Sequence, residues 1–125
     1  MSTYLAVAFG GALGAVARYW LSLSMESINS SNFPLGTFTV NLIGSFLIGV
    51  LFIVFTEKLE LAAQWRPLLI VGFLGAMTTF STFSLDALLL FQQGHYNTAL
   101  FYILGSVVSC LFAAYAGLQI TRVVL

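Results

Sequence analysis

The sequence predicts an all-α membrane protein in which four helices cross the bilayer. Of its 125 residues 60% are hydrophobic, and only four Lys/Arg and four Asp/Glu carry charge. Soluble domains are about 45–50% apolar and about 25% charged, and a chain this short buries too little of its surface to hide the excess. The uncharged stretches also have the right length, because a bilayer core of about 30 Å needs about 20 helical residues.

The same composition excludes several classes of function. The net charge is zero, so we expect no basic surface for nucleic acid. A single cysteine excludes a disulfide framework and any multi-cysteine metal site. One histidine and four scattered acids build no Ser-His-Asp, Cys-His or paired-carboxylate site, so we expect no enzyme.

Turn residues mark the ends of the predicted spans, which together form one domain over residues 1–125. Pro34 follows a polar loop, and Pro67 follows a Trp-Arg pair typical of a membrane interface. Gly94 is expected to cap the C-terminus of the third helix, and residues 57–60 form the only charge cluster. The spans are expected at residues 3–25, 34–56, 67–91 and 98–121.

The charges give a weak signal for orientation. Four spans put Lys58, Arg66 and Arg122 on one side and leave at most Arg18 for the other. A bias of three to one does not fix the orientation, so both are expected. Four packed helices enclose no water-filled hole, so a transporting chain would need a partner copy, and the many small residues in the spans would permit close helix contacts.

Asn41 lies well inside the second span, where an amide needs hydrogen-bond partners. It could join helices or line a pathway, and the pattern favours neither.

Arg18 lies about 22 Å along the first helix. Its side chain is expected to reach the membrane interface and bind a structural partner there, which is favoured over attracting anions to a vestibule. Asp86 lies near the end of the third span, where an interfacial position is expected.

The third span holds the least typical segment. Residues 72–84 contain two glycines and five hydroxyl side chains, which can bend or open a helix. A continuous helix and a helix broken at mid-membrane are both compatible with this pattern. A break would expose carbonyls to a hard cation and N–H groups to an anion. Phe80 and Phe83 share a face; their ring edges could support a small anion, although packing is the commoner role.

The segment from Gly75 to Ser84, Gly-Ala-Met-Thr-Thr-Phe-Ser-Thr-Phe-Ser, resembles the Fluc (CrcB) family of fluoride channels. Three more elements resemble it: the glycines before Arg18-Tyr19, the run from Pro34 to Asn41, and the Gln-Gln-Gly loop ending at Gly94. The resemblance covers essentially the whole chain.

This resemblance implies an antiparallel, dual-topology homodimer in the cell (inner) membrane, with two fluoride pathways at the subunit interface. Fluoride would leave the cytoplasm passively down its electrochemical gradient. The third helix would break at residues 75–78, where the carbonyls of Gly75 and Thr78 would hold a structural Na⁺ that is not transported. Ala76 replaces a glycine of the family pattern, which could narrow the backbone angles allowed at this site.

The resemblance also implies residues of the fluoride pathway. Phe80 and Phe83 would meet the anion with their ring edges, and Asn41 would be a polar pore residue. Hydroxyl groups would continue the pathway, at Ser81 and Thr82 in the third span and, with weaker support, at Ser106 and Ser109 in the fourth.

Two alternative functions stay open. A small proton-coupled multidrug exporter would need an acid embedded in the membrane, and the first span has none. A non-conducting accessory membrane subunit would use its small-residue faces for assembly and its polar residues to join helices.

Overall fold

The computed structural model describes residues 2–58 and 64–125. Four helical spans are long and apolar enough to cross a membrane: Ser2–Ser27, Leu35–Lys58, Pro67–Gln92 and Tyr96–Val124. The first is α1 (Ser2–Ser27), and the second is α2 (Leu35–Ile53) followed by a π-helical turn, η1 (Val54–Lys58). The third comprises η3 (Pro67–Leu74), α3 (Gly75–Met77) and α4 (Phe80–Gln92), and the fourth is α5 (Tyr96–Val124). The prediction of an all-helical chain with four such helices is confirmed.

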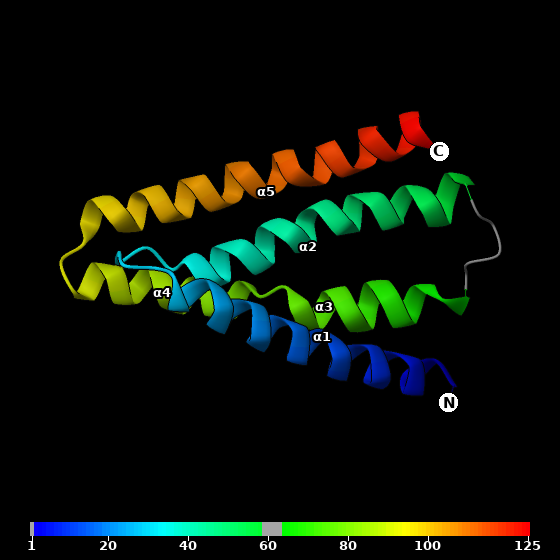
Figure 1. Ribbon diagram of the computed structural model, residues 1–125, viewed down its shortest axis with the longest axis horizontal. Helices are drawn as coiled ribbons and strands as arrows, with labels where there is room; N and C mark the ends of the chain where they lie inside the picture. Colours follow the sequence, from blue (N-terminus) through cyan, green and yellow to red (C-terminus); the bar gives the residue numbers. More distant parts are fainter. Residues whose placement is uncertain (1, 59–63) are drawn as a thin grey trace.

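The helices run roughly antiparallel to their neighbours in two pairs (Figure 1). α2 lies along α5, and α1 lies along the third span. Both termini, the end of η1 and the start of η3 lie at one end of the molecule. The α1–α2 and α4–α5 loops lie at the other end. At the terminal end Glu57 pairs with Arg122 at 3.1 Å; of the predicted charge cluster 57–60, Leu59 and Glu60 fall outside the described residues.

Glycines set the close spacing within each helix pair. A Cβ atom on Gly10 or Gly14 of α1 would overlap backbone carbonyl oxygens of η3. A Cβ atom on Gly49 of α2 or Gly117 of α5 would overlap a carbonyl of the facing helix in the same way. These small residues therefore pack the helices of a single chain against one another.

The backbone of the third span changes conformation at two threonines. Thr78 (φ −89°, ψ 156°) and Thr79 (φ −152°, ψ 121°) are extended, between helical backbone that ends at Met77 and resumes at Phe80. Gly75 is still helical (φ −60°, ψ −36°), so within the stretch 75–78 named by the family resemblance only Thr78 has an extended backbone. Within the described chain, positive φ occurs only at Gly94, so Ala76 meets no conformational penalty.

Local contacts close the end of the molecule opposite the termini. Gly94 has φ +84°, and the His95 N–H donates to the Leu90 carbonyl (2.9 Å), which is a Schellman C-cap as predicted. At the other loop the Glu26 carboxylate accepts from the Gly36 N–H at 2.7 Å, satisfying a free donor at the start of α2. The main buried cluster, which includes Phe83 and Tyr102, lies near this end, between α4 and α5.

Candidate functional site

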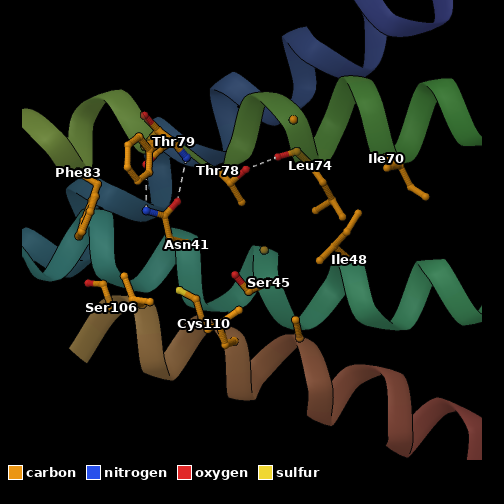
Figure 2. A pocket seen from close by; sticks show the side chains of 16 residues that line it. Asn41, Ser45, Ile48, Ile70, Leu74, Thr78, Thr79, Phe83, Ser106 and Cys110 are labelled. Atoms are coloured by element: carbon orange, nitrogen blue, oxygen red, sulfur yellow. Dashed lines mark hydrogen bonds between the residues drawn. The ribbon is translucent and has the colours of Figure 1, made fainter. Parts of the chain in front are cut away.

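An open groove of about 500 Å³ runs between α2, the third span and α5 (Figure 2). It is mostly apolar, with polar side chains gathered where the backbone of the third span is extended. Its lining residues are Asn41, Gly44, Ser45 and Ile48 of α2; Ile70, Leu74, Gly75, Thr78, Thr79, Phe80 and Phe83 of the third span; and Ser106, Val107, Cys110, Leu111 and Ala114 of α5.

Asn41 holds the extended segment from the opposite helix. Its Oδ1 atom accepts from the Thr79 N–H at 2.8 Å, and its Nδ2 atom donates to the Thr79 carbonyl at 3.0 Å (Figure 2). This pairing fixes the orientation of the amide, because the Thr79 N–H can only donate. Within the described chain Asn41 donates only this one Nδ2 hydrogen, so it could join the two helices and also donate its second hydrogen to a species in the groove.

Two carbonyls lose their helical donors at this point. In a helix the Thr79 N–H would bond the Gly75 carbonyl and the Thr82 N–H would bond the Thr78 carbonyl. The Thr79 N–H instead bonds Asn41, and the Thr82 N–H bonds the Thr79 hydroxyl at 3.1 Å. The carbonyl oxygens of Gly75 and Thr78 therefore do not receive their usual helical hydrogen bonds. Both residues line the groove.

The two phenylalanines differ in environment although their rings touch. Their centroids are 5.5 Å apart with the planes at 44°. Phe83 is buried (8% exposed) and packs on Tyr102, whereas Phe80 is 76% exposed. One ring is thus fixed in the core, and the other faces whatever surrounds or covers the groove.

Ser106 lines the groove and has a buried, unsatisfied hydroxyl. It is 5% exposed, and its Oγ atom has no hydrogen-bond partner within the described chain. A buried hydroxyl without a partner costs about 1–3 kcal/mol, so this position favours a bound polar species. One helical turn further along α5, the lining residue is Cys110 and not Ser109.

The sequence matches the family model described as CrcB-like protein, Camphor Resistance (CrcB), over residues 5–118. It is 51% identical over 119 residues to a protein named fluoride-specific ion channel FluC from Hahella chejuensis, covering 95% of this chain and 94% of that one. It is also 51% identical over 118 residues to a protein of the same name from Magnetococcus marinus (94% and 96% covered). A third of that name, from Saccharophagus degradans, is 48% identical over 119 residues (95% and 89% covered).

The chain belongs to the CrcB-like family. The family match and the four apolar helices together make it a multi-pass membrane protein. The match includes every residue of the groove, because the lining runs from Asn41 to Ala114.

The groove of this CrcB-like protein brings together only some of the predicted site residues. Asn41, Gly75, Thr78, Phe80, Phe83 and Ser106 line it. Ser81, Thr82 and Ser109 do not. Ser81 is exposed with its hydroxyl 3.2 Å from that of Thr79, and the Thr82 N–H makes the helix cap already described.

Arg18 also lies outside the groove. It is half-buried, and its Nε atom donates to the Ala76 carbonyl at 3.0 Å. A guanidinium at the last carbonyls of a helix offsets their partial negative charge. This contact gives Arg18 a backbone partner in the middle of the third span, two residues before the extended pair.

Sequence reasoning missed a second polar cluster. The buried Tyr102 hydroxyl donates to the Asp86 carboxylate at 3.2 Å, and both Asp86 and the nearly buried Thr37 line a cavity of about 310 Å³. Glu26 lines the same cavity near the α1–α2 loop. Asp86 was noted only as an interfacial acid; the clue to its partner was Tyr102, a tyrosine near the start of the next apolar span.

Proposed function

We propose that this protein is a fluoride-selective ion channel that carries fluoride out of the cytoplasm passively and so protects the cell from fluoride. The main support is its near-half identity, along almost its full length, to proteins named as fluoride-specific ion channels. The groove supports the same proposal, because polar side chains and two phenylalanines line it together. A channel of this kind performs no catalysis.

The groove offers an anion several weak contacts. Asn41 has a remaining amide hydrogen, and Ser106 has a buried hydroxyl without a partner in the described chain. The side chains of Phe80 and Phe83 line the groove, and the edges of aromatic rings carry partial positive charge. Conduction requires binding that is strong enough for entry and weak enough for release, and these groups supply it without a fixed positive charge in the groove lining.

The direction of transport follows from acid–base chemistry. Hydrogen fluoride enters a cell as a neutral acid and dissociates at neutral pH, which traps the anion inside. A selective anion pathway lets fluoride leave down its electrochemical gradient. No embedded carboxylate has to couple this movement to protons, and the Asp86 carboxylate is already engaged by Tyr102.

We propose further that two antiparallel copies assemble with their grooves facing the subunit interface, giving two pathways. The groove is open in the single chain, and the exposed Phe80 lies at its edge. The three-to-one division of Lys and Arg between the two ends is too weak to fix one orientation in the membrane. Copies of the chain would therefore insert in both orientations, as an antiparallel dimer requires.

A structural Na⁺ fits the carbonyls of Gly75 and Thr78. Oxygen ligands suit a hard cation, and these two oxygens have lost their helical donors to Asn41 and Thr79. The described residues hold no group of three or more His, Cys, Asp or Glu side chains that could bind a metal instead. The ion would neutralise the carbonyl ends of α3 and would stabilise the assembly; it would not be transported.

The deciding experiment is anion efflux from liposomes that contain the purified protein, with fluoride and chloride electrodes side by side. Rapid loss of fluoride with negligible loss of chloride is expected. Equal loss of both anions would contradict selectivity. Loss of neither, from protein shown to be dimeric, would support the accessory-subunit alternative.

Two further measurements separate the remaining alternatives. Proton-driven uptake of a cationic dye into vesicles would support a multidrug exporter and contradict the channel. Replacing Na⁺ by a larger monovalent cation during purification is expected to weaken the dimer or its fluoride flux. Insensitivity to that exchange would argue against the Na⁺ site and leave the fluoride pathway standing.

A further inference from the structure

Gly44 of α2 lies directly against the extended pair of the third span. A Cβ atom on Gly44 would overlap the Cγ2 methyl group of Thr78. Outside α2, the only other atom of the described chain within 4 Å of that position is the Thr78 Cβ atom, at 3.7 Å. Gly49 and Gly117 differ, because a Cβ atom on either would overlap a backbone carbonyl of the facing helix. Gly44 therefore makes room for one side chain, whereas those two glycines set the distance between helices.

The Thr78 side chain is held on two sides. Its Oγ1 atom donates to the Leu74 carbonyl at 2.9 Å (Figure 2), and its methyl group lies against Gly44. The hydroxyl and the methyl group share one carbon atom and occupy staggered positions, so they rotate together. Turning the methyl group away from α2 would move the hydroxyl off Leu74. This side chain keeps its orientation only while residue 44 has no side chain.

α2 thus contacts both residues of the extended pair. Asn41, three residues before Gly44 and on the same face of the helix, bonds the backbone N–H and carbonyl of Thr79. Gly44 receives the side chain of Thr78. The two contacts lie one helical turn apart, and together they fix the backbone that they hold. That backbone includes the Thr78 carbonyl, one of the two oxygens to which the structural Na⁺ is assigned above.

We infer that Gly44 is a positioning residue for the Na⁺ site. By receiving the methyl group of Thr78 it fixes the direction of the Thr78 carbonyl, although it offers the ion no side chain of its own. The inference rests on the proposed function, which supplies the Na⁺ site. It adds a residue of a different helix that controls the geometry of that site.

Gly44→Ala is the first variant of the test. Alanine is a better helix former than glycine, so local preference alone would strengthen α2, and any loss comes from the overlap with Thr78. We expect the Na⁺ concentration that gives half of the stabilisation to rise about tenfold, a usual coupling for two residues in contact. Gly105→Ala is the matched control, because no atom of another helix in the described chain lies within 4 Å of a Cβ atom there.

Thr78→Ser is the second variant, and it should cancel the effect of the first. It removes the methyl group and keeps a hydroxyl for the Leu74 carbonyl. A Cβ atom at position 44 then meets only the Cβ atom of residue 78, at 3.7 Å, an ordinary van der Waals contact. Adding Gly44→Ala to Thr78→Ser should therefore change the half-maximal Na⁺ concentration less than about twofold. Gly49→Ala, which overlaps the Ala114 carbonyl, should gain nothing from Thr78→Ser.

The measurement uses the full-length protein in detergent. The thermal midpoint is recorded as Na⁺ replaces N-methylglucamine at constant ionic strength, and fluoride efflux from liposomes is recorded in parallel. A weaker Na⁺ response in Gly44→Ala, cancelled in the presence of Thr78→Ser, would support the inference. An unchanged half-maximal concentration in Gly44→Ala would overturn it, and so would the same weakening with and without the methyl group. A midpoint lowered equally at every Na⁺ concentration would show a purely structural role and would also overturn it.

Two further outcomes are decided by the same variants. If Gly44→Ala yields no folded protein, recovery by Thr78→Ser with the Na⁺ response of Thr78→Ser alone would support the inference, and failure to recover would overturn it. Absence of any Na⁺ response in the unmodified protein would contradict the proposed Na⁺ site and the inference with it. Fluoride efflux in that same protein would leave the proposed channel function standing.

Discussion

The two halves of the third span make contact in different ways. The first half, η3 and α3 (residues 67–77), packs mainly on α1, where glycines bring backbone against backbone. The second half, α4 (Phe80–Gln92), packs on α5 through aromatic and polar side chains. The extended pair Thr78–Thr79 separates them.

The two halves of this span therefore have different roles: the first stabilises the fold, and the second shapes the groove. Backbone contact leaves no room for a side chain, so changes in the first half should prevent the protein from folding. Side-chain contact leaves the backbone in place, so changes at the start of the second half should alter the groove while the protein still folds. Substitutions on each side of the two threonines test this division.

The largest effect is expected from Gly14→Ala in α1. A Cβ atom there would overlap the backbone of Phe73, which cannot move without displacing η3. Overpacking of this kind typically costs about 1–3 kcal/mol and sometimes more. We expect little or no folded protein, measured as the monodisperse fraction in size-exclusion chromatography after detergent extraction.

Gly11→Ala is the matched control for that substitution. The nearest atom to a Cβ at Gly11 is the Gly72 carbonyl at 3.9 Å, an ordinary van der Waals contact. Normal yield of both variants would show that the first half tolerates separation from α1, and would remove the distinction between the two halves.

A smaller but still severe effect is expected from Asn41→Leu, which removes the two hydrogen bonds to the Thr79 backbone between the two halves of the third span. The N–H and carbonyl groups of Thr79 would both lose their partner, and each unsatisfied buried group costs about 1–3 kcal/mol. We expect lower thermal stability together with loss of fluoride efflux. Ser45→Ala, one turn along the same face of α2, is the control; equal losses in both variants would contradict a special role for Asn41.

Phe80→Ile should affect flux alone. The Phe80 side chain is 76% exposed in the single chain, so its loss removes little internal packing. We expect a folded, dimeric protein whose fluoride efflux is reduced at least tenfold, as measured with a fluoride electrode. Leu85→Ile, an exposed residue of α4 outside the groove lining, should conduct normally. Wild-type flux through Phe80→Ile would refute the pore role of this ring.

The sequence predicted the helices more completely than the contacts between them. Hydropathy and turn residues were sufficient for four spans, since each span is a local property of about 20 residues. The unusual content of glycine and hydroxyl residues in 72–84 was also visible in the sequence. The pattern could not decide between a continuous and an interrupted helix. That outcome depends on Asn41, more than thirty residues away, which accepts the Thr79 N–H.

Sequence spacing also failed to separate residues of α5 that differ by one position. Ser106, Ser109 and Cys110 all recur at helical spacing, and the choice between Ser109 and Cys110 depends on the rotation of α5 against α2. That rotation is set by Gly49 and Gly117, where the two backbones meet. The Asp86–Tyr102 pair was missed for the same reason, because no local pattern places two residues of different spans in contact.

The smallest effect is expected from Thr79→Ala, which acts between the two halves. It removes the N-cap of α4, a loss of about 0.5–2 kcal/mol. The freed Thr82 N–H can then turn to the Thr78 carbonyl, its ordinary helical partner, and that oxygen would no longer be available to a cation. We therefore expect a modest drop in thermal stability and a weaker dependence of that stability on Na⁺. Thr79→Ser keeps the acceptor for the Thr82 N–H and should preserve both properties. An unchanged response to Na⁺ in Thr79→Ala would mean that the cap does not control the Thr78 carbonyl. The hydrogen bonds between Asn41 and the Thr79 backbone alone would then keep the chain extended between the two halves.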